Sequence, residues 1–300
     1  MTAGPHVPSA GLLPVGLSLG PVRLAIGNLA RSLEFYRDRL GLAELRRGPA
    51  TAMLGAADGT SLITLDERPG AKPVPRQGRL GLYHVAILLP DRASLGRFLL
   101  HQNAIGTRFG ASDHLVSEAL YLTDPDGLGL EVYRDRPRGE WRMAQSADRP
   151  ELAMATDPLD ADAVVAAAGG VPWSGMPAGT TVGHLHLAVG NLDLATRFYR
   201  DGLGLDVTVS GYPGALFLSA GGYHHHLGLN TWAGPGIQPA ASDEARLAEW
   251  MVVLPTPADV GGVADRFIRA GFQPVGAGDD LMITDPWGVQ LRVVVQSNRT

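Results

Sequence analysis

The pattern of apolar and polar residues predicts short strands and amphipathic helices that follow one another in a fixed order. Segments 26–42 (IGNLARSLEFYRDRLGL) and 189–205 (VGNLDLATRFYRDGLGL) match without a gap. Each predicts a strand end, a helix entered at Asn-Leu, and a Leu-Gly-Leu stop. Segments 121–133 (YLTDPDGLGLEVY) and 282–294 (MITDPWGVQLRVV) each predict two strands joined by an Asp-Pro-x-Gly turn. The chain therefore consists of two similar halves.

Each half divides again into two units. Segments 83–106 and 249–272 repeat the strand–helix opening in a divergent form, so four units of one strand, one helix and three strands are expected. This order predicts an α+β fold. The expected divisions are an N-terminal arm (1–19), a first domain (20–136), a connector rich in Ala, Pro, Gly and Asp (137–178), and a second domain (179–296).

Composition narrows the class of protein. The chain has 300 residues, enough for two domains of roughly 150, and its 45% hydrophobic and 18% charged residues are typical of a globular protein. A net charge of −5 without a basic run argues against nucleic acid as the main partner. No apolar stretch is long enough to span a membrane, and the N-terminus lacks the basic region of a secretory signal, so a cytoplasmic location is expected. Without cysteine, any metal must be held by nitrogen and oxygen.

The repeated motifs carry a family resemblance. LEFYRDRLGL, TRFYRDGLGL, DPDGLGLEVYRDRP and GHLHLAVGNL resemble the vicinal oxygen chelate superfamily, which includes glyoxalase I, extradiol dioxygenases and antibiotic-resistance proteins. FGASDHLVSEALYLTDPDG and GGYHHHLGLNTW are similar to its two-domain catechol-2,3-dioxygenase-like branch. The resemblance implies four βαβββ modules paired into two domains, each a curved mixed sheet that forms a cup around a metal. Modules 1 and 2 are expected to form the first domain, and modules 3 and 4 the second.

The resemblance also implies that the metal ligands lie on the first and last strand of each module. Counting from the strand ends and from the turn glycines places His184, His226, Glu249 and Arg292 at these positions in the second half. Two imidazoles and a carboxylate suit non-haem Fe(II), so His184, His226 and Glu249 are the expected metal ligands. Arg292 would hold a substrate anion or pair with Glu249. In the first half the same count finds His84 and Glu131, which are interpreted as a vestigial site.

Further candidates follow from alternation along the strands. His224 shares a face with His226, and His186 shares one with His184, so both are expected to act in catalysis, whereas His225 should point away. Tyr223 and Trp232, together with Arg292, are candidate substrate contacts.

The leading hypothesis is an extradiol dioxygenase that opens a catechol-like aromatic ring with O₂ at Fe(II), with Mn(II), Zn(II) or Ni(II) as alternative metals. A second hypothesis is a metalloenzyme of glyoxalase type, which would use a further carboxylate where Arg292 stands. A third is a small-molecule-binding or resistance protein without turnover. The expected partners are a small aromatic substrate and O₂, with neither nucleic acid nor membrane; an oligomer is compatible with the sequence.

Overall fold

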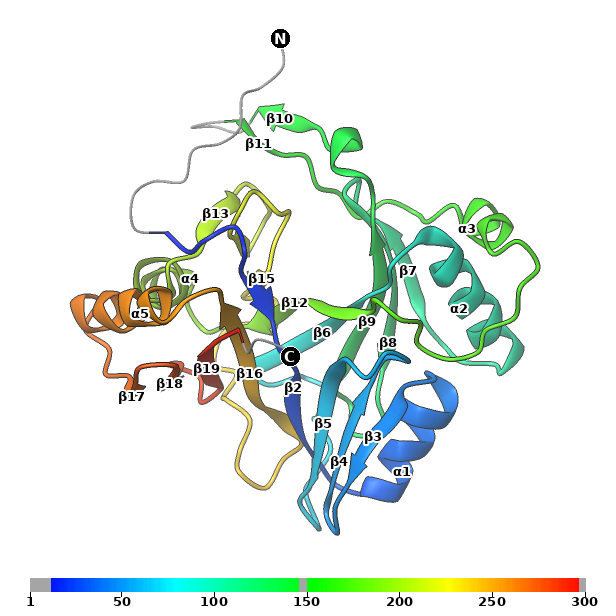
Figure 1. The fold of residues 1–300 in the computed structure, drawn as a ribbon, viewed down its shortest axis with the longest axis horizontal. Helices are drawn as coiled ribbons and strands as arrows, with labels where there is room; N and C mark the ends of the chain where they lie inside the picture. The colour runs from blue at the N-terminus through cyan, green and yellow to red at the C-terminus, as the bar shows by residue number, and fades with distance from the viewer. Residues whose placement is uncertain (1–11, 146–149, 297–300) are drawn as a thin grey trace.

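Two curved sheets dominate the computed structural model, which describes residues 12–145 and 150–296 (Figure 1). The nine-stranded sheet contains β1 (Ser18–Leu19), β2 (Val22–Ile26), β3 (Ala43–Arg47), β4 (Thr51–Gly55), β5 (Ser61–Glu67), β16 (Arg246–Leu254), β17 (Val275–Ala277), β18 (Asp280–Thr284) and β19 (Gln290–Val295). The eight-stranded sheet contains β6 (Gly81–Leu88), β7 (Gly110–Asp113), β8 (Ser117–Thr123), β9 (Gly129–Asp135), β12 (Thr181–Ala188), β13 (Asp206–Val209), β14 (Ala215–Ser219) and β15 (Leu227–Asn230). A separate hairpin pairs β10 (Met143–Gln145) with β11 (Pro150–Leu152).

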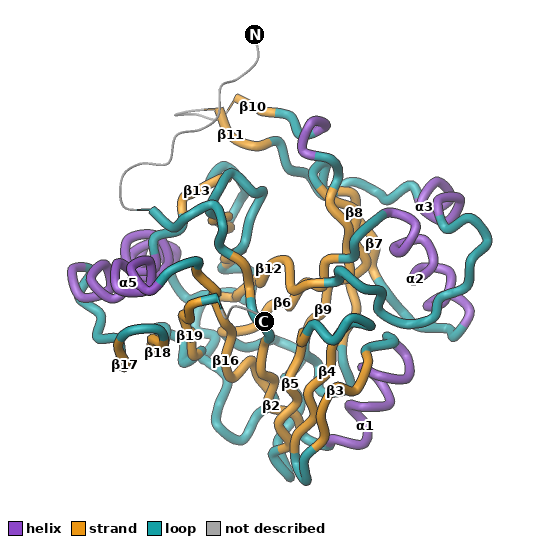
Figure 2. The backbone as a smooth tube through the Cα atoms, viewed as in Figure 1, coloured by secondary structure: helices purple, strands orange, loops and turns teal. Residues whose placement is uncertain are grey.

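Helices lie on the outer sides of these sheets (Figure 2). They are α1 (Leu29–Leu33), η1 (Glu34–Arg39), α2 (Arg92–Ala104), η2 (Arg138–Glu140), α3 (Ala161–Ala167), α4 (Leu192–Thr196), η3 (Arg197–Leu203) and α5 (Pro257–Arg269). The predicted Asn-Leu entries are helix caps, since Asn28 and Asn191 each accept a hydrogen bond from a backbone N–H three residues on. Both repeated helices then continue as wider π-helical turns, η1 and η3.

The four-module α+β architecture is confirmed, but the modules pair differently from the expectation. In the eight-stranded sheet β6 of module 2 pairs antiparallel with β12 of module 3, and in the other sheet β2 of module 1 pairs with β16 of module 4. Each sheet therefore takes strands from both sequence halves. The expected pairing of modules 1 with 2 and 3 with 4 is wrong, because an outer pair of modules encloses an inner pair along the chain.

The two Asp-Pro-x-Gly turns use the same hydrogen bonds. Asp124 Oδ1 accepts from the backbone N–H groups of Asp126 and Leu128, and Asp285 Oδ1 accepts from those of Trp287 and Val289. The turn glycines Gly127 and Gly288 both have φ of 87°, a conformation that favours glycine. These turns fix where β9 and β19 begin, and so fix the register of the strands that face each cup.

The apolar core is continuous through both sheets. One cluster of buried side chains includes Leu24, Leu54 and Trp250 from the nine-stranded sheet and Val85 and Leu187 from the eight-stranded sheet. In the described part of the chain, no helix is both long and apolar enough to cross a membrane.

Candidate metal centre

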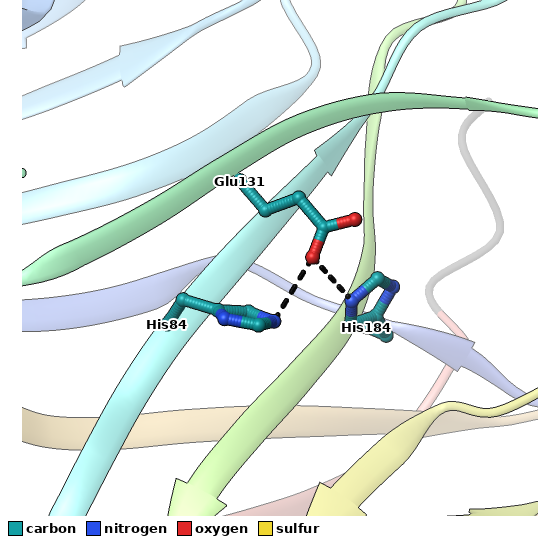
Figure 3. A group of neighbouring side chains, drawn as sticks. All are labelled: His84, Glu131 and His184. Atoms are coloured by element: carbon teal, nitrogen blue, oxygen red, sulfur yellow. Dashed lines mark hydrogen bonds and ion pairs between the residues drawn. The ribbon is translucent and has the colours of Figure 1, made fainter. Parts of the chain in front are cut away.

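Three adjacent strands of the eight-stranded sheet carry the candidate site. In the sheet register Glu131 on β9 lies beside Ala86 on β6, and Ala86 lies beside His184 on β12. Because Ala86 has only a methyl group, the carboxylate and the imidazole reach toward each other over it. His84 lies two residues from Ala86 on β6, so its side chain is on the same face of the sheet. The three polar side chains consequently converge (Figure 3).

The convergence is tight and buried. Glu131 Oε2 lies 3.1 Å from His184 Nε2 and 3.0 Å from His84 Nε2. One nitrogen or oxygen from each residue lies within 4.8 Å of the others, and no side chain of the three is more than 6% exposed. A group of this kind, with three ligand atoms around one point, matches the needs of a metal ion.

The protonation state also suits a cation. Burial raises the pKa of Glu131, but the interactions with His184 and His84 outweigh burial and hold the pKa well below its ordinary value. Burial lowers the pKa of His184 to about 4, against the opposing effect of Glu131. Near neutral pH the carboxylate is charged and the His184 imidazole is neutral, which is the state in which both coordinate metals.

One unsatisfied atom tests whether a metal fits. His84 Nε2 is buried and has no hydrogen-bond partner among the described residues, although it lies at the centre of the group. A buried polar nitrogen without a partner is costly, and a metal ion at this point would remove the cost. Two imidazoles and one carboxylate are also the donor set of non-haem iron sites with open coordination positions. The residues present therefore fit a divalent transition metal.

A cavity of about 510 Å³ opens beside the triad. His225, which lines it, stacks against His184 with ring centroids 4.1 Å apart. His224 Nε2 donates to the Asp135 carboxylate at 2.8 Å, and His224 Nδ1 lies 2.7 Å from His225 Nδ1. A neutral His224 accepts at Nδ1 from His225, so the lone pair of His225 is on Nε2. His225 therefore presents a candidate proton acceptor in the cavity.

A second imidazole in the cavity wall holds a tyrosine. His114 Nδ1 donates to the carbonyl of Ala155 at 2.6 Å, so its Nε2 accepts from the Tyr121 hydroxyl, also at 2.6 Å. Burial, with Glu131 nearby, raises the pKa of Tyr121, which keeps the side chain a neutral phenol. The Tyr121 oxygen retains lone pairs that a donor in the cavity can use.

The expected ligand set is not brought together. Glu249 is on β16, beside Arg23 and Gln290 in the nine-stranded sheet, and therefore belongs to the other cup from His184. Arg292 is in that same sheet and forms an ion pair with Asp280. His226 Nδ1 accepts from the backbone N–H of Ala220 and contacts the Ser219 hydroxyl. These placements correct the expectation for Glu249, Arg292 and His226, and they follow from the pairing of modules across the halves.

Alternation also misplaced the three adjacent histidines. β15 begins only at Leu227, so residues 224–226 do not alternate as strand residues do. His225 faces the cavity, whereas His224 is directed to Asp135 and Tyr223 donates to Asp135 and contacts Tyr133. His224 and Tyr223 therefore lie outside the cavity, and no pattern in the sequence singled out His225.

Other expected residues do meet at the site. His186 and Trp232 line the cavity, with ring centroids 5.4 Å apart. His84 and Glu131, interpreted from the sequence as a vestigial site, are two of the three converging side chains. The missing signal was the pairing of modules, since all three residues already stood at the counted positions.

Comparisons with known proteins agree with this architecture. The sequence model of the glyoxalase/bleomycin resistance protein/dioxygenase superfamily matches residues 18–132 and 181–293. Catechol-2,3-dioxygenase of Bacillus subtilis (strain 168) is 41% identical over 270 residues, which cover 89% of this chain and 93% of the relative.

Two solved structures share the fold. A candidate dioxygenase from Bacillus subtilis subsp. subtilis strain 168 aligns with a TM-score of 0.61 at 14% identity, over 93% of this chain and 84% of the other. Glyoxalase I from Zea mays aligns with a TM-score of 0.54 at 15% identity, over 93% of each chain. The chain therefore belongs to the glyoxalase/bleomycin resistance protein/dioxygenase superfamily.

Proposed function

We propose that the protein is an Fe(II)-dependent extradiol dioxygenase, in which His84, Glu131 and His184 hold the metal and a catechol is cleaved with O₂ beside one hydroxyl. The observation that carries the proposal is the buried convergence of two imidazoles and one carboxylate at the wall of a cavity. The similarity to a catechol-2,3-dioxygenase over most of both chains supports the reaction class. Fe(II) is favoured because this donor set leaves positions free for substrate and O₂.

A bound Fe(II) would supply Lewis acidity toward the catechol oxygens and the redox chemistry of O₂. The protein's own residues would hold the metal, orient the ring and move protons. His225 can take a phenolic proton at Nε2, and the Tyr121 oxygen can accept a hydrogen bond from the substrate. Both atoms of O₂ enter the ring-opened product, so no external reductant is needed.

The position opposite Glu131 bears on the glyoxalase-type alternative. That hypothesis needs a further carboxylate on a last strand of the same cup. The register places Gly228 beside His186, where the eight-stranded sheet would supply such a residue from β15. A glycine there supplies no ligand, which favours ring cleavage over isomerisation. The expected cytoplasmic location and any oligomer stay predictions from the sequence.

The test loads purified protein with Fe(II) without oxygen and then measures O₂ uptake with catechol. We expect O₂ consumption together with a yellow ring-opened product. His84→Ala, Glu131→Ala and His184→Ala should each weaken Fe(II) binding at least roughly tenfold and abolish activity, because each removes a ligand. Glu249→Gln and His226→Ala are matched controls and should keep iron. Iron bound without O₂ uptake for any catechol would contradict ring cleavage, and parallel loading with Mn(II), Zn(II) and Ni(II) tests the choice of metal.

His225 provides a separate prediction. His225→Gln should keep iron but lose roughly 10²–10⁴-fold in kcat, because general acid–base catalysis is worth about that factor. His224→Gln, which alters a side chain outside the cavity, should lose less. Iron content by atomic absorption and kcat by O₂ uptake measure the two effects. Unchanged kcat in His225→Gln would remove His225 from the mechanism.

A further inference from the structure

The cavity beside the triad is larger than one aromatic ring requires. Its volume is about 510 Å³, whereas a void of about 150 Å³ accommodates benzene. A catechol held at the triad therefore leaves space for a substituent. The chemistry of the walls indicates what kind of substituent fits this space.

The two sides of the cavity differ in polarity. Ser112, His114, Ser117 and Tyr121, from β7, β8 and the turn between them, give one side hydroxyl and imidazole groups. The other side is aromatic. It consists of Tyr83, His186, Tyr212, Phe217 and Trp232, which we call the aromatic wall.

Neighbouring rings of the aromatic wall contact each other. Tyr83 and Trp232 have centroids 5.6 Å apart, and Tyr212 lies 6.1 Å from both Phe217 and Trp232. Trp232 is fixed in place, since its Nε1 donates to the carbonyl of Pro213 at 3.0 Å. Nevertheless, Trp232 is 45% exposed and Tyr83 46% exposed. The wall thus offers apolar surface that a ligand can bury.

The cavity also lacks a positive group. Neither lysine nor arginine contributes to the wall as far as the described residues form it, and Glu131 is its one acidic residue. Arg92, Arg134 and Arg136 pair with Glu118 on β8, whose side chain alternates to the face opposite Ser117 and Tyr121. A carboxylate in the cavity would lose its water without gaining a charged partner, and it would lie near the charge of Glu131.

We infer that the substrate is an uncharged catechol whose hydrophobic substituent, alkyl or aryl, lies against the aromatic wall. This inference rests on the proposed ring cleavage and names its substrate class. The catechol hydroxyls face the triad, and the substituent covers Tyr83 and Trp232. A catechol bearing a carboxylate of the same length is excluded by the missing cation.

The experiment compares a matched pair, 4-ethylcatechol and 3,4-dihydroxyphenylacetate, with unsubstituted catechol as the reference. Anaerobic affinities for the Fe(II) protein are measured first, followed by kcat/KM from O₂ uptake. We expect 4-ethylcatechol to exceed catechol by on the order of tenfold, as two buried carbons predict, and to exceed the carboxylate by at least that factor. Equal or better binding and turnover of the carboxylate would overturn the inference. A binding preference for 4-ethylcatechol without turnover would support the inference and contradict ring cleavage.

Variants of the wall provide the second arm. Trp232→Ala should reduce the advantage of 4-ethylcatechol over catechol several-fold, because it removes apolar surface. Thr156, an exposed residue of the cavity wall, can receive a charge. Thr156→Arg should raise the carboxylate relative to 4-ethylcatechol by about tenfold, whereas the uncharged Thr156→Met should not. A Trp232→Ala variant with an unchanged preference would contradict the role of the aromatic wall.

Discussion

Gly228 occupies the place in module 3 that Glu131 occupies in module 2. Glu131 lies beside the residue two positions after His84, and Gly228 lies beside the residue two positions after His184. The ring of His186 fills the space above this glycine, since a Cβ built on Gly228 would lie 2.9 Å from the His186 ring. One residue thus keeps a fourth protein ligand out of the cup and lets His186 form part of the aromatic wall.

We expect Gly228→Ala to destabilise the protein by about 1–3 kcal/mol, because the added methyl must displace a buried ring attached to a neighbouring strand. The free energy of unfolding is measured by urea titration. Gly261→Ala in the exposed part of α5, where nothing lies within 4 Å of the new methyl, is the control. It should gain roughly 0.5–1 kcal/mol. Equal stability of Gly228→Ala and the parent would show that His186 moves without cost.

At the scale of elements, each half is joined by the same tyrosine–aspartate hydrogen bond. The Tyr36 hydroxyl donates to Asp124 at 3.0 Å, and the Tyr199 hydroxyl donates to Asp285 at 2.6 Å. These residues belong to the two repeated motifs, the helix FYRD and the turn TDP, that made the halves recognisable in the sequence. Each repeated helix is therefore attached to the turn that sets the register of a last strand, β9 or β19.

Asp124 makes this link sensitive to pH. Burial raises its pKa to about 6, against the stabilising hydrogen bonds it accepts. The folded state therefore binds the proton more tightly than the unfolded chain does, with its ordinary pKa near 3.9. The contribution of Asp124 to stability is complete below the unfolded pKa and is lost as the pH rises through about 6. Between pH 4.5 and 7.5 the loss is about 2 kcal/mol.

Asp124→Asn removes this titration. We expect the stability of the parent relative to Asp124→Asn to fall by about 2 kcal/mol from pH 4.5 to 7.5. Urea titrations of chelator-treated protein across this range measure the difference without a contribution from metal. Parallel stability curves for the two proteins would contradict the raised pKa.

Local spacing carries much of this information, and long-range pairing does not. The helix entries at Asn28 and Asn191 and the turns at Asp124 and Asp285 were predictable because their hydrogen bonds join residues two to four apart. The pairing of β6 with β12 was not, since a twofold repeat is equally compatible with cups within halves and across them. The ligand set failed with it. His84, Glu131 and His184 stood at the counted positions, but only the sheet order decides which of these positions share a cup.

At the scale of the whole molecule, the sharing of sheets couples the two sequence halves. The candidate metal centre takes His84 and Glu131 from one half and His184 from the other. The apolar core runs through both sheets, and Lys72 and Leu80 form backbone bridges to Glu244 and Pro239. Neither half can complete a sheet or the site without the other, so the halves are not independent folding domains.

This coupling predicts one cooperative unfolding transition. By calorimetry of the apo protein, we expect the van't Hoff and calorimetric enthalpies to agree, as they do for a two-state unit. Leu54→Ala tests the coupling from the sheet that lacks the triad, since Leu54 is fully buried in β4 and its truncation should cost about 2–5 kcal/mol. If the molecule unfolds as one unit, this variant lowers the temperature at which the Fe(II)-loaded protein releases iron by the same amount as it lowers the loss of secondary structure. Two calorimetric transitions, or iron retained after the nine-stranded sheet has unfolded, would show that the cups are separable.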